Sequence, residues 1–311
     1  MKSGPQELFQ LVGHTPLVEL KHVSPKPRVH IFAKLEGANP SGSVKDRIVL
    51  AMVEAAERRG DLKPGGTIVE ASTGNTAIAA ALIGKQKGYA VRVVLPRGIV
   101  PSVADLLALY GAEIVWCEPV GGMHGAIELA KAMAEEEGAY PLGQFTDQVN
   151  VDSHYHTTGV EIADAMDAVD VFVAGIGTGG TIMGVGKRLR ETWPDLRIVG
   201  VEPRLGERLQ GLRSLSEGYI PPLLDLDQLS ARYLVGSSDA IKTARQVVEG
   251  EGIFAGVSSG ATLHVALRIA ETMESGNIVV MFSDGGWKYL PAKPWDAAEH
   301  GEENLDEVHW W

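Results

Sequence analysis

Short β-rich runs alternate with helical patterns along almost the whole chain, and this alternation constrains the fold more than any other feature. Most of the predicted strands lead through a polar or glycine-containing turn into a predicted helix. The predicted strands cover residues 29–35, 67–70, 90–95, 113–117, 169–174, 196–201 and 278–282. Strands that alternate with helices form parallel sheets covered by helices on both faces. We therefore expect an α/β fold of two doubly wound domains with parallel-rich, twisted sheets and a binding site between them.

The predicted domain boundary lies near residue 150. We expect a smaller α/β domain over residues 40–150 and a larger one made of residues 1–39 and 151–298. Residues 204–230 contain two adjacent prolines and show no periodic pattern, which indicates a loop over a surface or cleft. The acidic tail, residues 299–311, ends in Trp310 and Trp311, and we expect it to dock on the protein because disordered tails seldom keep tryptophans.

The composition excludes several classes of function. The 311 residues carry a formal charge of −12, which argues against binding to nucleic acid or to an anionic membrane. The first residues lack an apolar secretory segment, and no apolar run approaches the roughly 20 residues that a membrane helix needs. A cytoplasmic location is the expectation.

The cysteine and histidine pattern does not predict a metal site. The single cysteine, Cys117, excludes an internal disulfide and a multi-cysteine metal site, and its place in a predicted strand indicates core packing. His154 and His156 are separated by one residue, and in a strand such residues point to opposite faces. Structural roles are the better interpretation of both histidines.

A single lysine, Lys45, stands where a loop is expected to turn into a helix. Pro40 and Gly42 precede it, and residues 48–56 follow with apolar side chains at helical spacing. Ser43 suits the N-cap position, so Lys45 falls in the first turn, where the helix dipole disfavours a cation. The ordinary interpretation is an exposed surface lysine. The alternative is an amine kept neutral to attack a carbonyl.

A glycine-rich turn over residues 175–181 follows a predicted strand, at the position where open α/β sheets bind ligands. Its backbone N–H groups and two threonine hydroxyls at a helix N-terminus can hold a phosphate without a basic side chain. Gly175, Gly177 and Gly180 also match the G-x-G-x-x-G pattern of dinucleotide-binding proteins, and Glu202 ends the next strand where a ribose-binding acid would lie. A nicotinamide-dependent oxidoreductase is therefore an alternative, weakened by the proline that directly follows this glutamate.

A second polar turn lies between the strand at residues 67–70 and the next predicted helix. It brings three hydroxyl groups and one amide to a helix N-terminus, an arrangement that suits a substrate carboxylate. The residues of this turn are Ser72, Thr73, Gly74, Asn75 and Thr76. Similar turns often serve only to cap a helix.

Four segments occur in an order that resembles the cysteine synthase family of fold-type II pyridoxal-phosphate enzymes. They are residues 39–47, 72–76, 177–181 and 251–261, and the resemblance extends from about Leu11 to Leu290. The resemblance implies a tryptophan synthase β-like fold with the cofactor in the cleft between two domains. It also implies a homodimer and an amino-acid substrate. Ala77 and the segment 144–150 depart from the usual family pattern.

The resemblance assigns roles to individual residues. Lys45 carries the Schiff base, Asn75 bonds the ring oxygen of pyridoxal 5'-phosphate, and Ser258 meets the pyridine nitrogen. The cofactor phosphate is held by Gly177, Thr178, Gly179, Gly180 and Thr181. The substrate carboxylate is held by Ser72, Thr73, Gly74, Thr76 and Gln144.

The expected reaction is β-replacement. A hydroxyl beside the pyridine nitrogen favours loss of a β-leaving group over transamination, so an activated L-serine should give an aminoacrylate and then L-cysteine. Residues 207–221 are similar to a loop of O-phosphoserine sulfhydrylases, in which the arginine matching Arg213 recognises the substrate phosphate. That branch takes sulfur from a thiocarboxylated carrier protein, and its tail can enter the active site. Cysteine synthase B, which uses O-acetylserine, is the alternative within the family.

Overall fold

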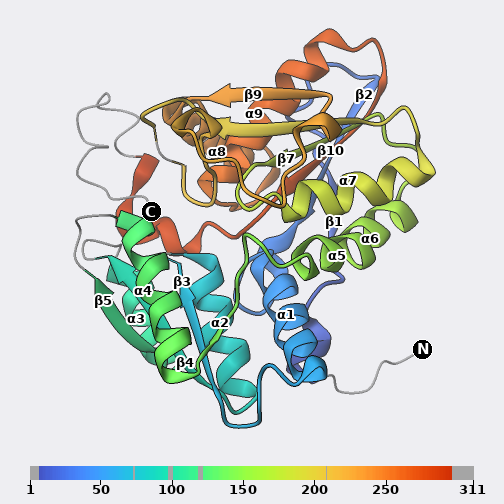
Figure 1. Cartoon of the computed structure of the whole chain (residues 1–311). Coiled ribbons are helices and arrows are strands. Elements are labelled where there is room, and N and C mark those ends of the chain that lie inside the picture. Colours follow the sequence, from blue (N-terminus) through green and yellow to red (C-terminus); the bar gives the residue numbers. More distant parts are fainter. Residues whose placement is uncertain (1–6, 73, 97–100, 118–121, 208, 296–311) are drawn as a thin grey trace.

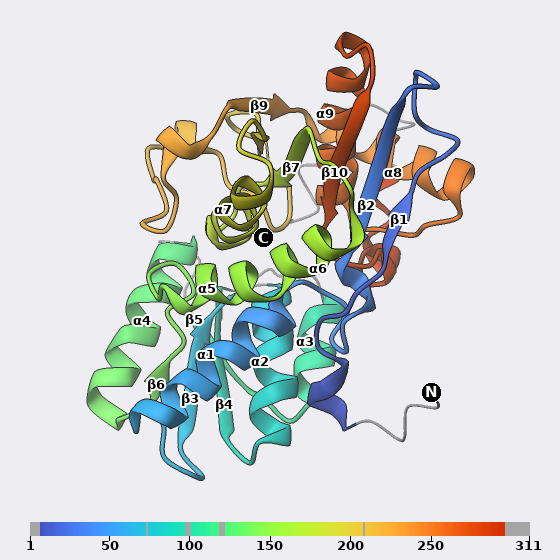
Figure 2. The ribbon, with the colours of Figure 1, turned by 90° about the vertical axis from the view of Figure 1, so that its right-hand side faces the viewer.

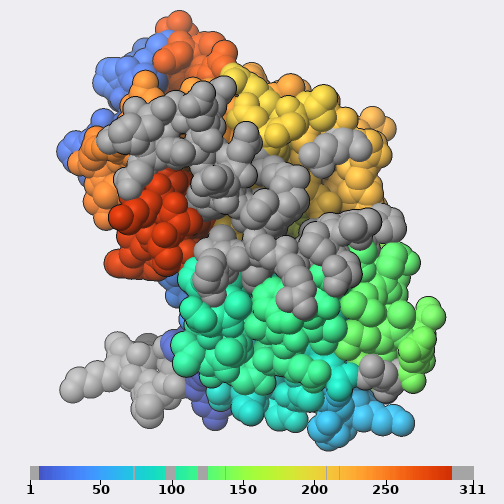
Figure 3. Space-filling view, turned by 90° about the vertical axis from the view of Figure 1, so that its left-hand side faces the viewer, coloured from blue at the N-terminus to red at the C-terminus, as the bar shows by residue number. Residues whose placement is uncertain are grey.

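The computed structural model describes residues 7–72, 74–96, 101–117, 122–207 and 209–295. The chain forms two lobes, each built on one β-sheet with helices packed against it (Figure 1). Viewed from another side, the yellow-to-red segments lie above the teal and green segments, and blue segments occur in both parts (Figure 3). The predicted α/β fold with parallel-rich sheets is confirmed.

The larger sheet has six strands in the order β1-β2-β10-β7-β8-β9. Only β1 runs antiparallel, beside β2, and the other neighbours are parallel. Its strands are β1 (Leu17–Glu19), β2 (Val29–Leu35), β7 (Val171–Gly175), β8 (Arg197–Pro203), β9 (Ala231–Val235) and β10 (Gly276–Phe282).

Both faces of the larger sheet are buried, as the continuous apolar strands predict. Val171 and Val173 of β7 pack with α8 (Ser237–Glu251) and α9 (Val257–Thr272) on one face. Phe172 and Ala174 pack with α6 (Thr158–Ala165) and α7 (Gly180–Thr192) on the other. Alternate residues of one strand therefore supply two separate cores.

The smaller sheet has four parallel strands in the order β5-β4-β3-β6. The strands are β3 (Thr67–Ala71), β4 (Ala90–Pro96), β5 (Glu113–Cys117) and β6 (Tyr140–Pro141). One face packs on α1 (Lys45–Arg59), α2 (Asn75–Gln86) and α3 (Pro101–Leu109), and the other face packs on α4 (Gly122–Glu137). Cys117 is 9% exposed at the end of β5, in agreement with its predicted place in the core.

The expectation of a strand around His154 and His156 is wrong. These residues end helix α5 (Val149–His156), which packs on α1 and α7 where the two lobes meet (Figure 2). The segment is poor in strong helix formers, so its helix depends on tertiary packing that the local sequence does not reveal. Strands β1, β6 and β9 were also not predicted.

The segment 204–230 is mostly irregular, as expected. It contains two short 3-10 helices, Leu215–Glu217 and Leu226–Gln228, and three others lie at Leu8–Leu11, Glu36–Ala38 and Trp287–Ala292. The predicted domain bounds, 40–150 against 1–39 with 151–298, stay a prediction. The tail with Trp310 and Trp311 lies outside the described residues.

A buried ion network connects the lobes. The Arg47 guanidinium on α1 donates to Glu36 after β2, with Nε 2.6 Å from Oε2, and to Glu161 on α6, with Nη1 2.7 Å from Oε1. Lys34 on β2 places its Nζ 2.6 Å from Glu161 Oε2. Two cations thus balance two carboxylates, and the network fixes the first turn of α1 against the larger sheet.

Removal of Arg47 should be strongly destabilising. In Arg47→Met the Glu36 carboxylate stays buried without its partner, and breaking such a pair costs about 3–5 kcal/mol of unfolding free energy. Urea unfolding followed by circular dichroism measures this change. Lys131→Met, which removes an exposed cation paired with Glu128, is the control and should leave the midpoint unchanged. An Arg47→Met midpoint equal to the wild-type midpoint would contradict the role of the network.

The same network predicts an acid-sensitive stability. Burial acts to raise the pKa of Glu161, but hydrogen bonds from Arg47 and Lys34 outweigh burial and lower this pKa from 4.5 to about 2. The ionised carboxylate therefore stabilises the fold above the unfolded-state pKa, and this contribution is lost as the pH falls towards 2. Thermal unfolding of Glu161→Gln between neutral and acidic pH should show a flatter pH dependence than wild type. Parallel curves for the two proteins would refute this assignment.

Candidate active site

A cavity of about 300 Å³ is lined by residues from both lobes. It lies at the carboxyl ends of β3 and β7, where parallel sheets bind ligands. Most of the residues that the sequence predicts for the site line it. They are Lys45, Ser72, Gly74, Asn75, Thr76, Gln144, Gly177, Thr178, Gly179, Thr181, Arg213 and Ser258. Gly180 begins α7 behind this lining, and Thr73 lies outside the described residues.

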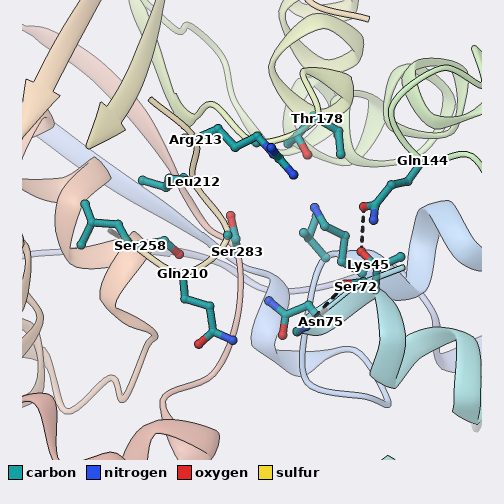
Figure 4. A pocket seen from close by; sticks show the side chains of 18 of the residues that line it. Lys45, Ser72, Asn75, Gln144, Thr178, Gln210, Leu212, Arg213, Ser258 and Ser283 are labelled. Atoms are coloured by element: carbon teal, nitrogen blue, oxygen red, sulfur yellow. Dashed lines mark hydrogen bonds between the residues drawn. The ribbon is translucent and has the colours of Figure 1, made fainter. Parts of the chain in front are cut away.

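Lys45 is the first residue of α1 and lies near the centre of the cavity (Figure 4). Val44, rather than the predicted Ser43, occupies the N-cap position, although Ser43 Oγ still accepts a hydrogen bond of 3.3 Å from the Lys45 N–H. The loop before the helix is fixed to the end of β10, since Val44 N donates to Ser283 O at 2.8 Å. The N–H groups of Val44 and Lys45 thus both make hydrogen bonds that fix the start of α1.

The environment of the Lys45 amine favours its neutral form. Burial lowers the pKa of Lys45 from 10.5 to about 8; the negative charge of Asp284 opposes this change and the positive charge of Lys288 adds to it. A neutral amine is the nucleophilic form, and it can also accept a proton. Lys45 is partly buried and lines the cavity, which argues against the ordinary interpretation of an exposed surface lysine.

The glycine-rich turn connects β7 to α7 in a conformation that suits an anion. Gly179 has a φ of 90°, and a Cβ at Gly177 would lie 2.6 Å from Gly211 O, so both positions need glycine. The N-terminus of α7 leaves N–H groups without helical partners, which suits a phosphate.

His154 supports this loop from α5. Its Nε2 lies 3.1 Å from Thr181 Oγ1 and its Nδ1 lies 2.9 Å from Thr158 Oγ1. Burial, with the charges of Arg47 and Lys45, holds the pKa of His154 well below its usual range, so the ring is neutral. The sequence interpretation gave His154 a structural role but could not identify these contacts, because it placed the residue on a strand.

Glu202 contacts other residues of the protein. The dinucleotide interpretation requires this residue to bind the ligand instead. Glu202 is fully buried, its Oε2 accepts from the Leu215 N–H at 2.5 Å, and its Oε1 lies 2.9 Å from Arg232 Nε. These contacts give it a structural role at the end of β8.

The second polar turn and Gln144 form one hydrogen-bonded group. Thr76 Oγ1 donates to Gln144 Oε1 at 2.8 Å, and Gln144 Nε2 donates to Glu70 Oε1 at 2.6 Å (Figure 4 shows the first of these bonds). Glu70 was not among the predicted site residues, because it lies within the strand before the turn. Gln144, which the family resemblance assigns to the site, lines the cavity beside this turn although it lies 68 residues after Thr76 in the chain.

Two contacts from outside the cavity orient the amide of Asn75. Its Nδ2 donates to Asp284 Oδ2 at 2.8 Å, and its Oδ1 accepts from Lys288 Nζ. The lysine also pairs with the aspartate, with Nζ 2.5 Å from Oδ2. One N–H of the Asn75 amide remains for a ligand.

Arg213 lies against two aromatic rings. Its guanidinium carbon is 4.6 Å from the centroid of Phe145 and 5.5 Å from the centroid of Tyr219. These rings come from different lobes and hold the planar group at the cavity. Gln210 and Ser214 line the cavity from the same irregular segment, and their polar side chains in a loop were the only sequence signal for them.

Helix α9 begins at Val257 with Gly256 at its N-cap, so Ser258 lies in its first turn. The Ser258 side chain is 4% exposed and lines the cavity.

The charges and donors of the cavity suit an anionic ligand. Among the described lining residues, Lys45 and Arg213 are the basic side chains and Glu207 is the one acid, in a chain of formal charge −12. The buried Ser214 Oγ has no hydrogen-bond partner among the described residues. The donors fit pyridoxal phosphate: an amine for its aldehyde, and N–H groups and hydroxyls for its phosphate. Within the described ranges, no group of three metal-ligating side chains occurs and no helix is long and apolar enough to span a bilayer.

Comparison with curated proteins identifies close relatives. The chain is 40% identical over 293 residues to a cysteine synthase of Staphylococcus aureus (strain N315), covering 91% of this chain and 94% of that protein. It is 39% identical over 284 residues to cysteine synthase B of Salmonella typhimurium (strain LT2), with the same coverage of 91% and 94%.

Solved structures show the same architecture. The crystal structure of O-ureido-L-serine synthase superposes with a TM-score of 0.91 at 33% identity, covering 97% of this chain and 99% of that one. A cysteine synthase from Entamoeba histolytica superposes with a TM-score of 0.89 at 32% identity, covering 98% and 95%. The family described as "Pyridoxal-phosphate dependent enzyme" matches residues 8–284. The chain therefore belongs to the pyridoxal-phosphate-dependent enzyme family.

Proposed function

We propose that this protein makes L-cysteine by β-replacement on an activated L-serine, with O-phospho-L-serine as the preferred substrate. The observation that carries the proposal is a cavity lined by an amine, by a glycine-rich turn and a polar turn that each begin a helix, and by an arginine beside an aromatic ring. The relatives named cysteine synthase support the reaction class.

Bound pyridoxal phosphate supplies an electron sink for the charge left on the substrate Cα. Lys45 holds the cofactor through its amine and, once released, takes the Cα proton and later returns it. Its lowered pKa suits both roles, because the neutral amine is both nucleophile and base. The Ser258 hydroxyl would meet the pyridine nitrogen of the bound cofactor, and a hydroxyl partner, unlike an acid, would not hold this nitrogen protonated, which would favour loss of the β-substituent.

The other predicted residues bind and orient. The N–H groups and hydroxyls of Gly177, Thr178, Gly179, Gly180 and Thr181 hold the cofactor phosphate, and the remaining N–H of Asn75 donates to the ring oxygen. The substrate carboxylate binds at the N-terminus of α2 among Ser72, Thr73, Gly74 and Thr76, with Gln144 as a further donor. The smaller domain over residues 40–150 carries this carboxylate loop, and the larger domain carries the phosphate and ring contacts.

Arg213 selects the leaving group. A guanidinium donates two parallel hydrogen bonds to a phosphate, and its stacking on Phe145 and Tyr219 fixes the plane of the fork. O-acetyl-L-serine is the second candidate substrate, favoured by the likeness to cysteine synthase B. Sulfide or a thiocarboxylated carrier protein supplies the sulfur, and the active protein is a homodimer.

Substitution of the lysine tests the proposed chemistry. Lys45→Ala should reduce cysteine formation by about 10²–10⁴-fold, because the Cα proton loses its acceptor, and should change the visible absorbance of the bound cofactor. Lys87→Ala, which removes a lysine paired with Glu57, is the matched control and should behave as wild type. Turnover and absorbance unchanged in Lys45→Ala would exclude this role.

Substrate competition tests the leaving group. Arg213→Ala should lower kcat/KM for O-phosphoserine about 10–100-fold more than for O-acetylserine, since a charge-assisted hydrogen bond contributes about 1.5–3 kcal/mol. Arg59→Ala, which removes a surface arginine paired with Asp61, should affect neither substrate. Equal losses for the two substrates would show that Arg213 does not recognise the phosphate.

A further inference from the structure

Glu70 is a buried acid beside the carboxylate turn that the proposed chemistry leaves unused. It is 5% exposed on β3, one residue before the end of the strand. Its Oε1 accepts the 2.6 Å hydrogen bond from Gln144 Nε2. Burial of a charged carboxylate is costly, and the Gln144 amide that donates to Glu70 carries no charge to offset this cost.

The hydrogen bonds around Gln144 fix which way its amide points. The oxygen accepts from the Thr76 hydroxyl at 2.8 Å, and one N–H donates to Glu70. An amide has two N–H donors, so one is left for a ligand in the cavity that Gln144 lines. Without the acceptor at residue 70, the amide could turn and present its oxygen, which would repel a carboxylate.

The surroundings of Glu70 supply no compensating charge. The strands beside β3 carry Arg92 and Tyr140, which bond to Glu113 and Arg59 instead. The described ionisable groups of the two helices that pack on β3 are Lys85 on α2 and, on α4, Glu128, Lys131, Glu135 and Glu136. None of these groups shifts the pKa of Glu70, and neither do Lys45, Arg213 or Glu207 of the cavity. Burial raises this pKa to about 8, and the hydrogen bond from Gln144 opposes the change.

We infer that Glu70 is a positioning residue for the substrate carboxylate. As a neutral acid, Glu70 holds the Gln144 amide in its donating orientation. The inference rests on the proposed function, because it assigns the turn at residues 72–76 to a substrate carboxylate. When Glu70 ionises, it places a negative charge one hydrogen-bonded side chain away from that carboxylate. Binding therefore weakens as the pH rises, and binding in turn makes the acid take up a proton.

The test measures the affinity of the cofactor-loaded protein for L-serine, which has the carboxylate but no good leaving group. Binding is followed by the change in cofactor absorbance from about pH 7 to about pH 9.5. In Glu70→Gln the neutral amide keeps the acceptor and cannot ionise. We expect its affinity to equal that of wild type at low pH and to exceed it by about 10-fold one pH unit above the pKa. Parallel pH profiles would overturn the inference.

Two further variants separate charge from position. Glu70→Asp keeps the acid but shortens the side chain, so it should weaken L-serine binding at low pH while kcat for the activated substrate changes little. Glu113→Gln removes an exposed carboxylate from the neighbouring strand β5 and should follow the wild-type profile. If Glu113→Gln instead gained affinity at high pH as Glu70→Gln does, a general charge effect would explain both results and the specific role of Glu70 would be refuted.

Calorimetry supplies a readout independent of turnover. Titration of L-serine near pH 8 in buffers of different ionisation enthalpy should show more proton uptake by wild type than by Glu70→Gln, and equal uptake would contradict the inference. Failure of the proposed function is distinguishable. If cofactor-loaded wild type and Glu113→Gln give no response to L-serine or to activated serines, the substrate class is wrong, and the role of Glu70 falls with it.

Discussion

The buried ion network around Arg47 is the interaction on which the site depends. Arg47 follows Lys45 by two residues in the first turn of α1, so the two side chains leave the helix in nearly opposite directions. One enters the cavity, and the other is fixed by Glu36 and Glu161. A helix end held in this way places the amine without relying on contacts in the cavity itself, which stay available for ligands.

The cavity uses backbone more than charge to bind anions. The proposed phosphate and carboxylate sites lie at the N-termini of α7 and α2, which follow strands of different sheets. Each provides N–H groups at the positive end of a helix dipole. A chain of formal charge −12 thus has a cavity whose backbone donors suit ligands with several negative groups, and the two described basic side chains that line it, Lys45 and Arg213, take the roles proposed above.

The sequence predicted the features that are local and missed those that depend on packing. Strands such as β2 and β7 are short apolar runs bounded by turn residues, and the glycine-rich turn has its own signature, so both could be located from the sequence. Helix α5 could not, because its residues favour a helix only when packed on α1 and α7. The contacts of Glu70 and His154 were missed for the same reason, since each joins segments that are distant or misassigned in the sequence.

The most direct test of this account is to identify the lysine that holds the cofactor. Borohydride reduction of the cofactor-loaded protein fixes a phosphopyridoxyl group on that lysine, and peptide mass spectrometry then locates the modified residue. The account predicts modification at Lys45 in a single peptide. Modification at Lys288, the other lysine close enough to influence the Lys45 amine, or at a surface lysine would contradict it.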